Sequence, residues 1–147
     1  MTRHEATAQI IAAQQAKGIK WTEIAARVGH SPAWTTAALL GQHAMSAPEA
    51  AAATEALGLG PEVALALQSF PMRGSLEDPV PTDATIYRFY ELIQVYGPTI
   101  KALIHEEFGD GIMSAIDFSM DIERVPDPKG DRVKVTLNGK FLEYKKF

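Results

Sequence analysis

The chain of 147 residues has the length of one average domain or two small ones. Apolar residues make up 46% and charged residues 22%, a globular composition with no segment polar enough to stay unfolded. The absence of cysteine excludes disulfides, thiolate metal sites and a cysteine nucleophile. The net charge is −4, and residues 1–75 carry five basic and five acidic side chains, so this half has no basic excess for nucleic acid. No secretory signal and no membrane-spanning apolar run is present, and we expect a cytoplasmic protein without a membrane partner.

The first half predicts a compact bundle of short helices, because apolar positions recur at helical spacing and glycines separate the segments. Ser31 followed by Pro32 is typical of an N-cap and the first helical position. Ser46 and Glu49 have the spacing of a capping box. Gly58 stands where a helix C-cap is expected.

One segment of this bundle has the shape of a helix-turn-helix, with a helix over Thr22 to Val28, a turn at Gly29 and a second helix from Ser31. A DNA-binding regulator with a C-terminal dimerisation domain is therefore the alternative function. The second helix contains no lysine or arginine, however, and so offers no phosphate contact. We expect no nucleic-acid partner and a helical domain that packs through residues such as Trp34 and Leu39.

The proline-rich stretch from Phe70 to Pro81 cannot continue a helix and predicts a linker. We therefore expect an N-terminal helical domain over residues 1–75 and a C-terminal catalytic and dimerisation domain over residues 76–147. After the linker, Thr82 or Asp83 can cap one helix, and Pro98 can start a second that ends near Phe108.

From Ile112 onward apolar residues alternate, which predicts strands, with a turn over Pro126 to Gly130. Asn138-Gly139 is a strong signal for a further hairpin turn. The fold class is thus α+β. So few strands cannot cover both faces of a sheet, and we expect a second subunit to complete them.

The candidate chemistry lies in the second half. Arg88 and Glu91 are three residues apart, so both project from one helix face; an exposed ion pair worth about 0.5 kcal/mol is the simplest interpretation. The aromatic residues Tyr87, Phe89 and Tyr90 around them favour a functional pair instead. Ser114 opens the first strand but lies in no Gly-x-Ser-x-Gly elbow. The four histidines lack metal-ligand spacing, and no phosphate-binding glycine loop is present, so we expect no metal and no nucleotide.

The runs PTDATIYRFYELIQVYG (81–97) and KALIHEEFGDGIMSAIDF (101–118) resemble the signature region of cyanases, also called cyanate hydratases or cyanate lyases. By this resemblance the catalytic residues are Arg88, Glu91 and Ser114. It also implies a C-terminal domain that interlocks with a second subunit, and dimers assembled into a decamer with active sites between subunits.

The resemblance further implies a lyase that decomposes cyanate to carbon dioxide and ammonia through carbamate. Bicarbonate is then the co-substrate, and no cofactor is needed. Arg88 would stabilise and orient the two anions, Ser114 would hydrogen-bond to substrate, and Glu91 would position Arg88 or handle a proton. A structural oligomer that has lost activity is a third interpretation, and the presence of all three residues argues against it.

Overall fold

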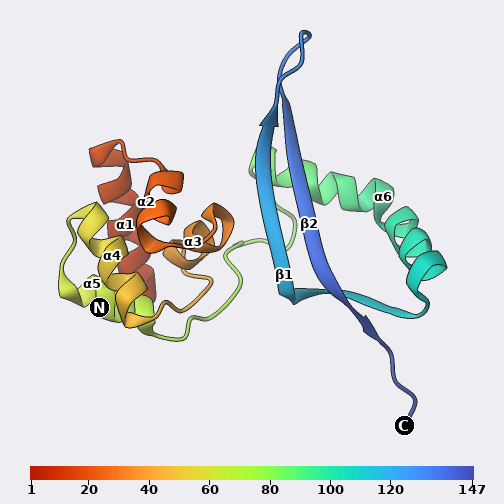
Figure 1. The fold of residues 1–147 in the computed structure, drawn as a ribbon, viewed down its shortest axis with the longest axis horizontal. Coiled ribbons are helices and arrows are strands. Elements are labelled where there is room, and N and C mark those ends of the chain that lie inside the picture. The colour runs from red at the N-terminus through yellow and green to blue at the C-terminus, as the bar shows by residue number, and fades with distance from the viewer. The chain divides into compact units, whose positions relative to one another are not determined.

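The computed structural model describes all residues, 1–147, as six helices followed by a two-stranded antiparallel sheet (Figure 1). The predicted α+β class is confirmed. The elements are α1 (Arg3–Lys17), α2 (Trp21–Val28), α3 (Pro32–Leu39), α4 (Ala47–Leu57), α5 (Pro61–Gln68), α6 (Ala84–Phe108), β1 (Gly111–Val125) and β2 (Arg132–Glu143). No helix combines the length and the apolar character needed to cross a bilayer.

The chain divides into two compact units, one of Met1–Ser75 with Met120–Thr136 and the other of Leu76–Ser119 with Leu137–Phe147. The second stretch of each unit belongs to the hairpin, so its strands contribute to both units. The domain boundaries expected from the sequence, 1–75 and 76–147, stay a prediction.

Local capping signals fix the ends of the N-terminal helices. Ser31 is the N-cap of α3, and its hydroxyl accepts a hydrogen bond from the amide of Trp34 at 3.2 Å. Before α4, the amide of Ser46 donates to Glu49 Oε2 at 2.6 Å. Gly58 ends α4 with a φ of +67°, a left-handed conformation that favours glycine. These three predictions from the sequence are confirmed.

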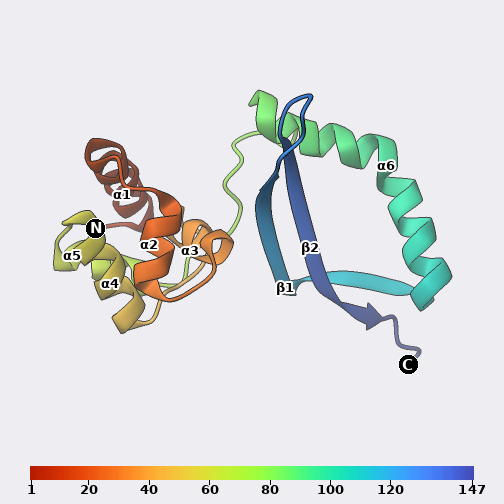
Figure 2. The same ribbon diagram turned by 45° about the horizontal axis from the view of Figure 1, so that its top comes forward.

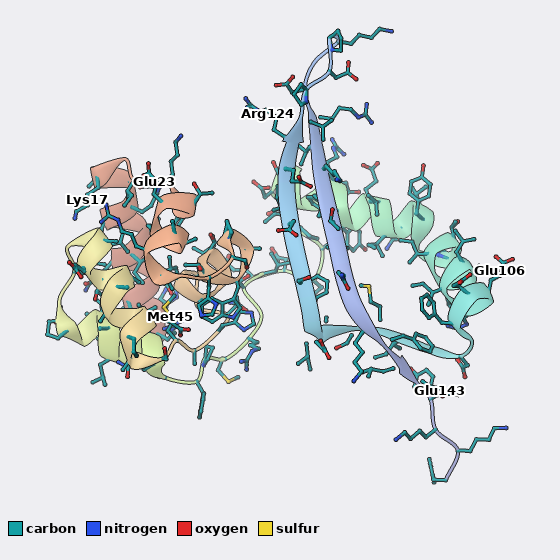
Figure 3. The ribbon with its side chains drawn as sticks, viewed as in Figure 1. Lys17, Glu23, Met45, Glu106, Arg124 and Glu143 are labelled. Carbon is teal, nitrogen blue, oxygen red and sulfur yellow. The ribbon has the colours of Figure 1, made fainter.

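The core of the N-terminal unit is made of aliphatic side chains that α1 to α5 contribute jointly. The largest fully buried ones are Ile10, Ile24, Leu39, Leu57, Val63 and Leu67. Met45, which lies among the helices in Figure 3, is 3% exposed in the segment between α3 and α4. The helices α2 and α3 therefore form part of one bundle core.

Arg3 ties three segments of this unit together from the start of α1. Its guanidinium donates to the carbonyl oxygens of Ala66 (2.9 Å), Ala38 (2.6 Å) and His43 (2.7 Å). Ala66 and Ala38 lie in the last turns of α5 and α3, where the negative end of the helix dipole favours a cation. Burial lowers the pKa of Arg3 from its ordinary value, but an arginine stays charged.

The segment after the linker forms one helix, not two. Asp83 caps α6 and accepts hydrogen bonds from the amides of Thr85 and Ile86, both at 2.9 Å. Pro98, expected to start a second helix, lies inside α6. Proline removes an amide donor and crowds the preceding turn, so it bends a helix without always ending it. The bend of α6 is visible in Figures 1 and 2.

The strands β1 and β2 pair as a long hairpin, as the alternating pattern predicts. The turn expected over Pro126 to Gly130 is confirmed, because β1 ends at Val125 and β2 begins at Arg132. The second turn expected at Asn138-Gly139 is wrong, since both residues lie within β2. Gly139 serves another purpose there, because it allows a close approach of β1.

Candidate active site

Arg88 and Glu91 form an ion pair on α6, as their spacing predicts. The Arg88 Nη1 nitrogen donates to Glu91 Oε2 at 2.9 Å. The side chains are 68% and 51% exposed, so in a single chain the pair lies in solvent. An exposed pair of this kind contributes little to folding. The stability of the single chain therefore does not explain why Arg88 and Glu91 are paired.

An aromatic ring lies against the Arg88 side of this pair in the first half of α6. The Arg88 guanidinium carbon lies 5.9 Å from the centroid of the Tyr87 ring, a distance at which a cation and a ring attract each other. The ring of Tyr90 lies 5.8 Å from that of Tyr87. Packing against a ring restricts the orientation of a guanidinium whose remaining donors stay free.

Ser114 differs from the pair because it is 4% exposed. Its hydroxyl oxygen accepts hydrogen bonds from the amides of Ile116 at 3.0 Å and Asp117 at 2.9 Å. A hydroxyl has two acceptor positions and one proton, so both acceptor positions are occupied. The hydroxyl donates no hydrogen bond within the chain, so its proton stays available to a ligand. This arrangement suits binding of an anion rather than nucleophilic attack.

Both bonds that the Ser114 hydroxyl accepts come from amides of its own strand, β1. Such local bonds from the backbone to a serine side chain compete with pairing to the neighbouring strand. The sequence placed Ser114 near the start of the strand but did not predict these bonds; serine next to a strand start is the signal that could have suggested them.

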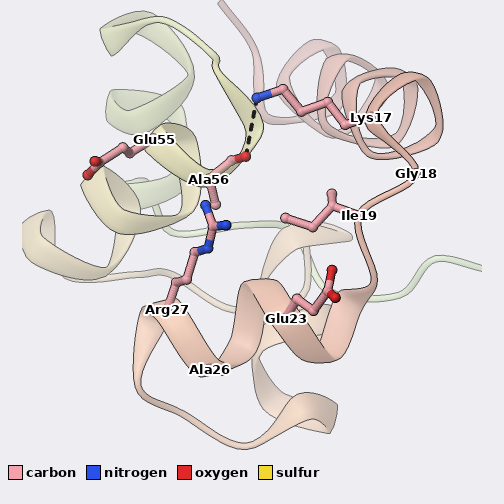
Figure 4. A pocket seen from close by; sticks show the side chains of 8 residues that line it. All are labelled: Lys17, Gly18, Ile19, Glu23, Ala26, Arg27, Glu55 and Ala56. Atoms are coloured by element: carbon pink, nitrogen blue, oxygen red, sulfur yellow. Dashed lines mark hydrogen bonds between the residues drawn. The ribbon is translucent and has the colours of Figure 1, made fainter.

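The structure brings Arg88 and Glu91 together but joins neither to Ser114. No hydrogen bond or ion pair links Ser114 to either residue within the chain. A described pocket of about 770 Å³ lies elsewhere, among N-terminal helices, and contains none of the three residues (Figure 4). Lys17, whose Nζ donates to the Ala56 carbonyl at 3.3 Å, and Arg27 line it together with acidic side chains.

No group of three or more histidine and acidic side chains is placed to hold a metal ion. The expectation that the protein needs no metal and no cofactor stays a prediction. The candidate residues provide the guanidinium of Arg88, the carboxylate of Glu91 and the hydroxyl of Ser114. The guanidinium and the hydroxyl are donors that suit small anions.

Comparison with known proteins identifies the family. Residues 3–71 match the family model "Cyanate hydratase, N-terminal", and residues 78–146 match "Cyanate lyase C-terminal domain". The chain is 58% identical over 147 residues to the cyanate hydratase of Cupriavidus necator, covering 100% of both chains. It is 56% identical over 144 residues to that of Mycolicibacterium vanbaalenii, covering 98% of this chain and 94% of the other.

A solved structure is similar across nearly the whole chain. The crystal structure of cyanase from T. urticae superimposes with a TM-score of 0.83 at 39% sequence identity, covering 95% of this chain and 97% of that one. The resemblance predicted from residues 81–118 is thus confirmed by sequence and by fold. The chain belongs to the cyanate hydratase (cyanase) family of lyases.

Proposed function

We propose that this protein decomposes cyanate to carbon dioxide and ammonia, with bicarbonate as co-substrate and without a cofactor. The observation that carries the proposal is the Arg88–Glu91 pair on α6, held at 2.9 Å in a chain whose relatives at 56–58% identity are named cyanate hydratases. The donors of Arg88 that Glu91 leaves free, together with the Ser114 proton, suit two small anions.

The chemistry needs charge stabilisation more than a nucleophile from the protein. An oxygen of bicarbonate attacks the cyanate carbon, and the cyanate nitrogen takes up a proton. The hydroxyl hydrogen that came with bicarbonate then moves to the same nitrogen, and the bond between the bridging oxygen and the former bicarbonate carbon breaks, which releases carbon dioxide and leaves carbamate. Carbamate takes up a further proton and breaks its C–N bond to give ammonia and a second carbon dioxide. Each turnover therefore consumes two protons in total.

Each residue has a role that follows from its contacts. Arg88 would offset the repulsion between the two anions and orient them through its planar donors. Glu91 would hold the guanidinium in place through their shared hydrogen bond. Ser114 would donate a hydrogen bond to a substrate oxygen, because the two acceptor positions of its hydroxyl are already occupied by backbone amides.

The active site would lie between subunits of a decamer built from dimers. Two observations support this part of the proposal: Ser114 contacts neither Arg88 nor Glu91 within the chain, and α6 has no buried residue. A single arginine would bind two anions weakly, whereas the symmetry of an oligomer can bring Arg88 side chains from neighbouring chains to one pocket.

The DNA-binding alternative is not favoured. The helix α3 carries no basic side chain, and Thr35, Ala38 and Leu39 on it are fully buried. A recognition helix must present side chains to base edges and to phosphates. These three residues of the helix serve the bundle core instead.

The test is release of ammonia from cyanate by the assembled protein, with and without bicarbonate. We expect turnover only with bicarbonate, and two molecules of carbon dioxide for each ammonia. With ¹³C-bicarbonate, one of these two should carry the label. Folded and assembled protein that shows no bicarbonate-dependent turnover would contradict the proposal.

A further inference from the structure

Gly139 lies opposite Ser114 where β2 pairs with β1. A Cβ atom built on Gly139 would overlap the Ser114 carbonyl oxygen, and it would lie 2.6 Å from Met113 Cγ. The favourable van der Waals separation of two non-bonded carbon atoms is at least about 3.5 Å. The side chain of Met113 is flexible and can move aside, but the carbonyl belongs to the backbone of the candidate site residue itself.

The absence of a side chain at this position therefore has a direct effect on Ser114. The Ser114 carbonyl and hydroxyl belong to the same residue, so a backbone shift moves both. The two bonds that the hydroxyl accepts, at 3.0 Å from Ile116 and 2.9 Å from Asp117, allow little displacement before they break. If one of these bonds broke, an acceptor position would become free and the hydroxyl could rotate, so it would no longer be held ready to donate to substrate.

We propose that Gly139 is a positioning residue for catalysis, which holds the Ser114 hydroxyl in place by leaving room for the Ser114 carbonyl. This inference rests on the proposed function, in which the Ser114 proton binds a substrate oxygen. It also gives a reason for glycine in mid-strand, where glycine otherwise weakens a sheet. Gly139 has no positive φ, so space and not backbone conformation is the requirement.

The chain offers a matched control in Gly111. A Cβ atom there would overlap the carbonyl of Leu142 and lie 2.8 Å from Phe141 Cε2, a clash of the same kind in the same hairpin. That clash falls on β2 and not on Ser114. Gly139→Ala and Gly111→Ala should therefore disturb the hairpin alike but differ in their effect on the hydroxyl.

Two measurements on the assembled protein separate positioning from stability. The first is hydrogen–deuterium exchange of peptides covering residues 112–118, in wild type, Ser114→Ala, each glycine variant and the double variant Gly139→Ala/Ser114→Ala. The second is kcat/KM for cyanate with bicarbonate. Misplacement by about 1 Å can cost about a hundredfold in rate, so we expect Gly139→Ala to lose at least about tenfold and Gly111→Ala less than about threefold.

The exchange data should show that Gly139 acts through Ser114. We expect Gly139→Ala and Ser114→Ala each to quicken exchange of this segment, and the double variant to be no faster than Ser114→Ala. Retained protection in Gly139→Ala, additive effects in the double variant, or equal loss of kcat/KM in both glycine variants would each overturn the inference. Inactive wild-type protein would contradict the proposed function alone, because the exchange data still decide whether Gly139 holds Ser114.

Discussion

Arg88 uses one guanidinium nitrogen on Glu91 and leaves its other donors free. Lysine at this position would keep the charge but not the planar fork that can hold two anions at once. We expect Arg88→Lys to lose at least about tenfold in kcat/KM while the oligomer stays intact. Ammonia release and light scattering on the same sample measure both. Near-normal turnover would remove Arg88 from the mechanism.

Arg3 is the residue on which the N-terminal bundle should depend most visibly. Its three hydrogen bonds join α1 to the carbonyls of Ala38 in α3, Ala66 in α5 and His43 in the segment between α3 and α4. We expect Arg3→Met to lower the free energy of unfolding by about 2–4 kcal/mol, because charged hydrogen bonds contribute more than neutral ones.

The control for Arg3 is Arg27, an exposed arginine of α2 without a hydrogen bond to the protein. Arg27→Met should change the unfolding free energy by less than about 0.5 kcal/mol. Urea denaturation followed by circular dichroism compares the two. Equal effects would show that the carbonyl contacts of Arg3 do not stabilise the bundle.

At the scale of elements, the start of α4 should respond to acid. The amide of Ser46 and the ring of His30, which lies 2.5 Å from the carboxylate, both contact Glu49, and the Ser46 amide is the main cause that lowers the pKa of Glu49 below its ordinary 4.5. A lowered pKa in the folded state gives stability that is present above 4.5 and is lost as pH falls through the folded value.

The wild-type protein should lose stability as pH falls below about 5, and we expect Glu49→Gln to reduce this loss by up to about 1 kcal/mol. Glu55→Gln, on the same helix but without a side-chain hydrogen bond, should keep the wild-type profile. Thermal melts across this pH range measure the difference. Identical profiles for both variants would show that the capping carboxylate does not contribute.

The elements also show what the sequence could and could not predict. Helix caps such as Ser31 and Gly58 depend on neighbouring residues, so their types suffice. The Arg88–Glu91 contact follows from helical spacing in the same way. The predictions from Pro98 and Asn138-Gly139 are wrong because a proline can bend a helix without ending it, and a glycine can make room for a neighbouring strand. Only the tertiary arrangement decides between such uses. The close approach of Gly139 to Ser114 likewise depends on how the two strands pair.

At the scale of the whole molecule, the two halves differ in how they bury apolar surface. The N-terminal helices enclose a core, whereas α6, with 25 residues, has no buried residue. Ile93, Tyr96 and Leu103 are each more than half exposed, and Ile116 on β1 is 97% exposed. Apolar patches of this extent mark interaction surfaces. In the proposed interlocked dimer, a second chain would cover these apolar residues.

This argument makes activity depend on assembly. Leu103 is 60% exposed on α6, and a charge there would have to be buried if a partner chain covers the helix. We expect Leu103→Glu to shift light scattering toward smaller species and to abolish turnover, while circular dichroism still reports folded N-terminal helices. Glu106→Gln, on the same helix (Figure 3), is the control and should keep both assembly and activity.

Dilution and mild denaturant should give the same relation in wild type, with turnover proportional to the oligomer fraction. A fully active monomer would show that one chain contains a complete site, and it would require Ser114 to act without a partner's Arg88.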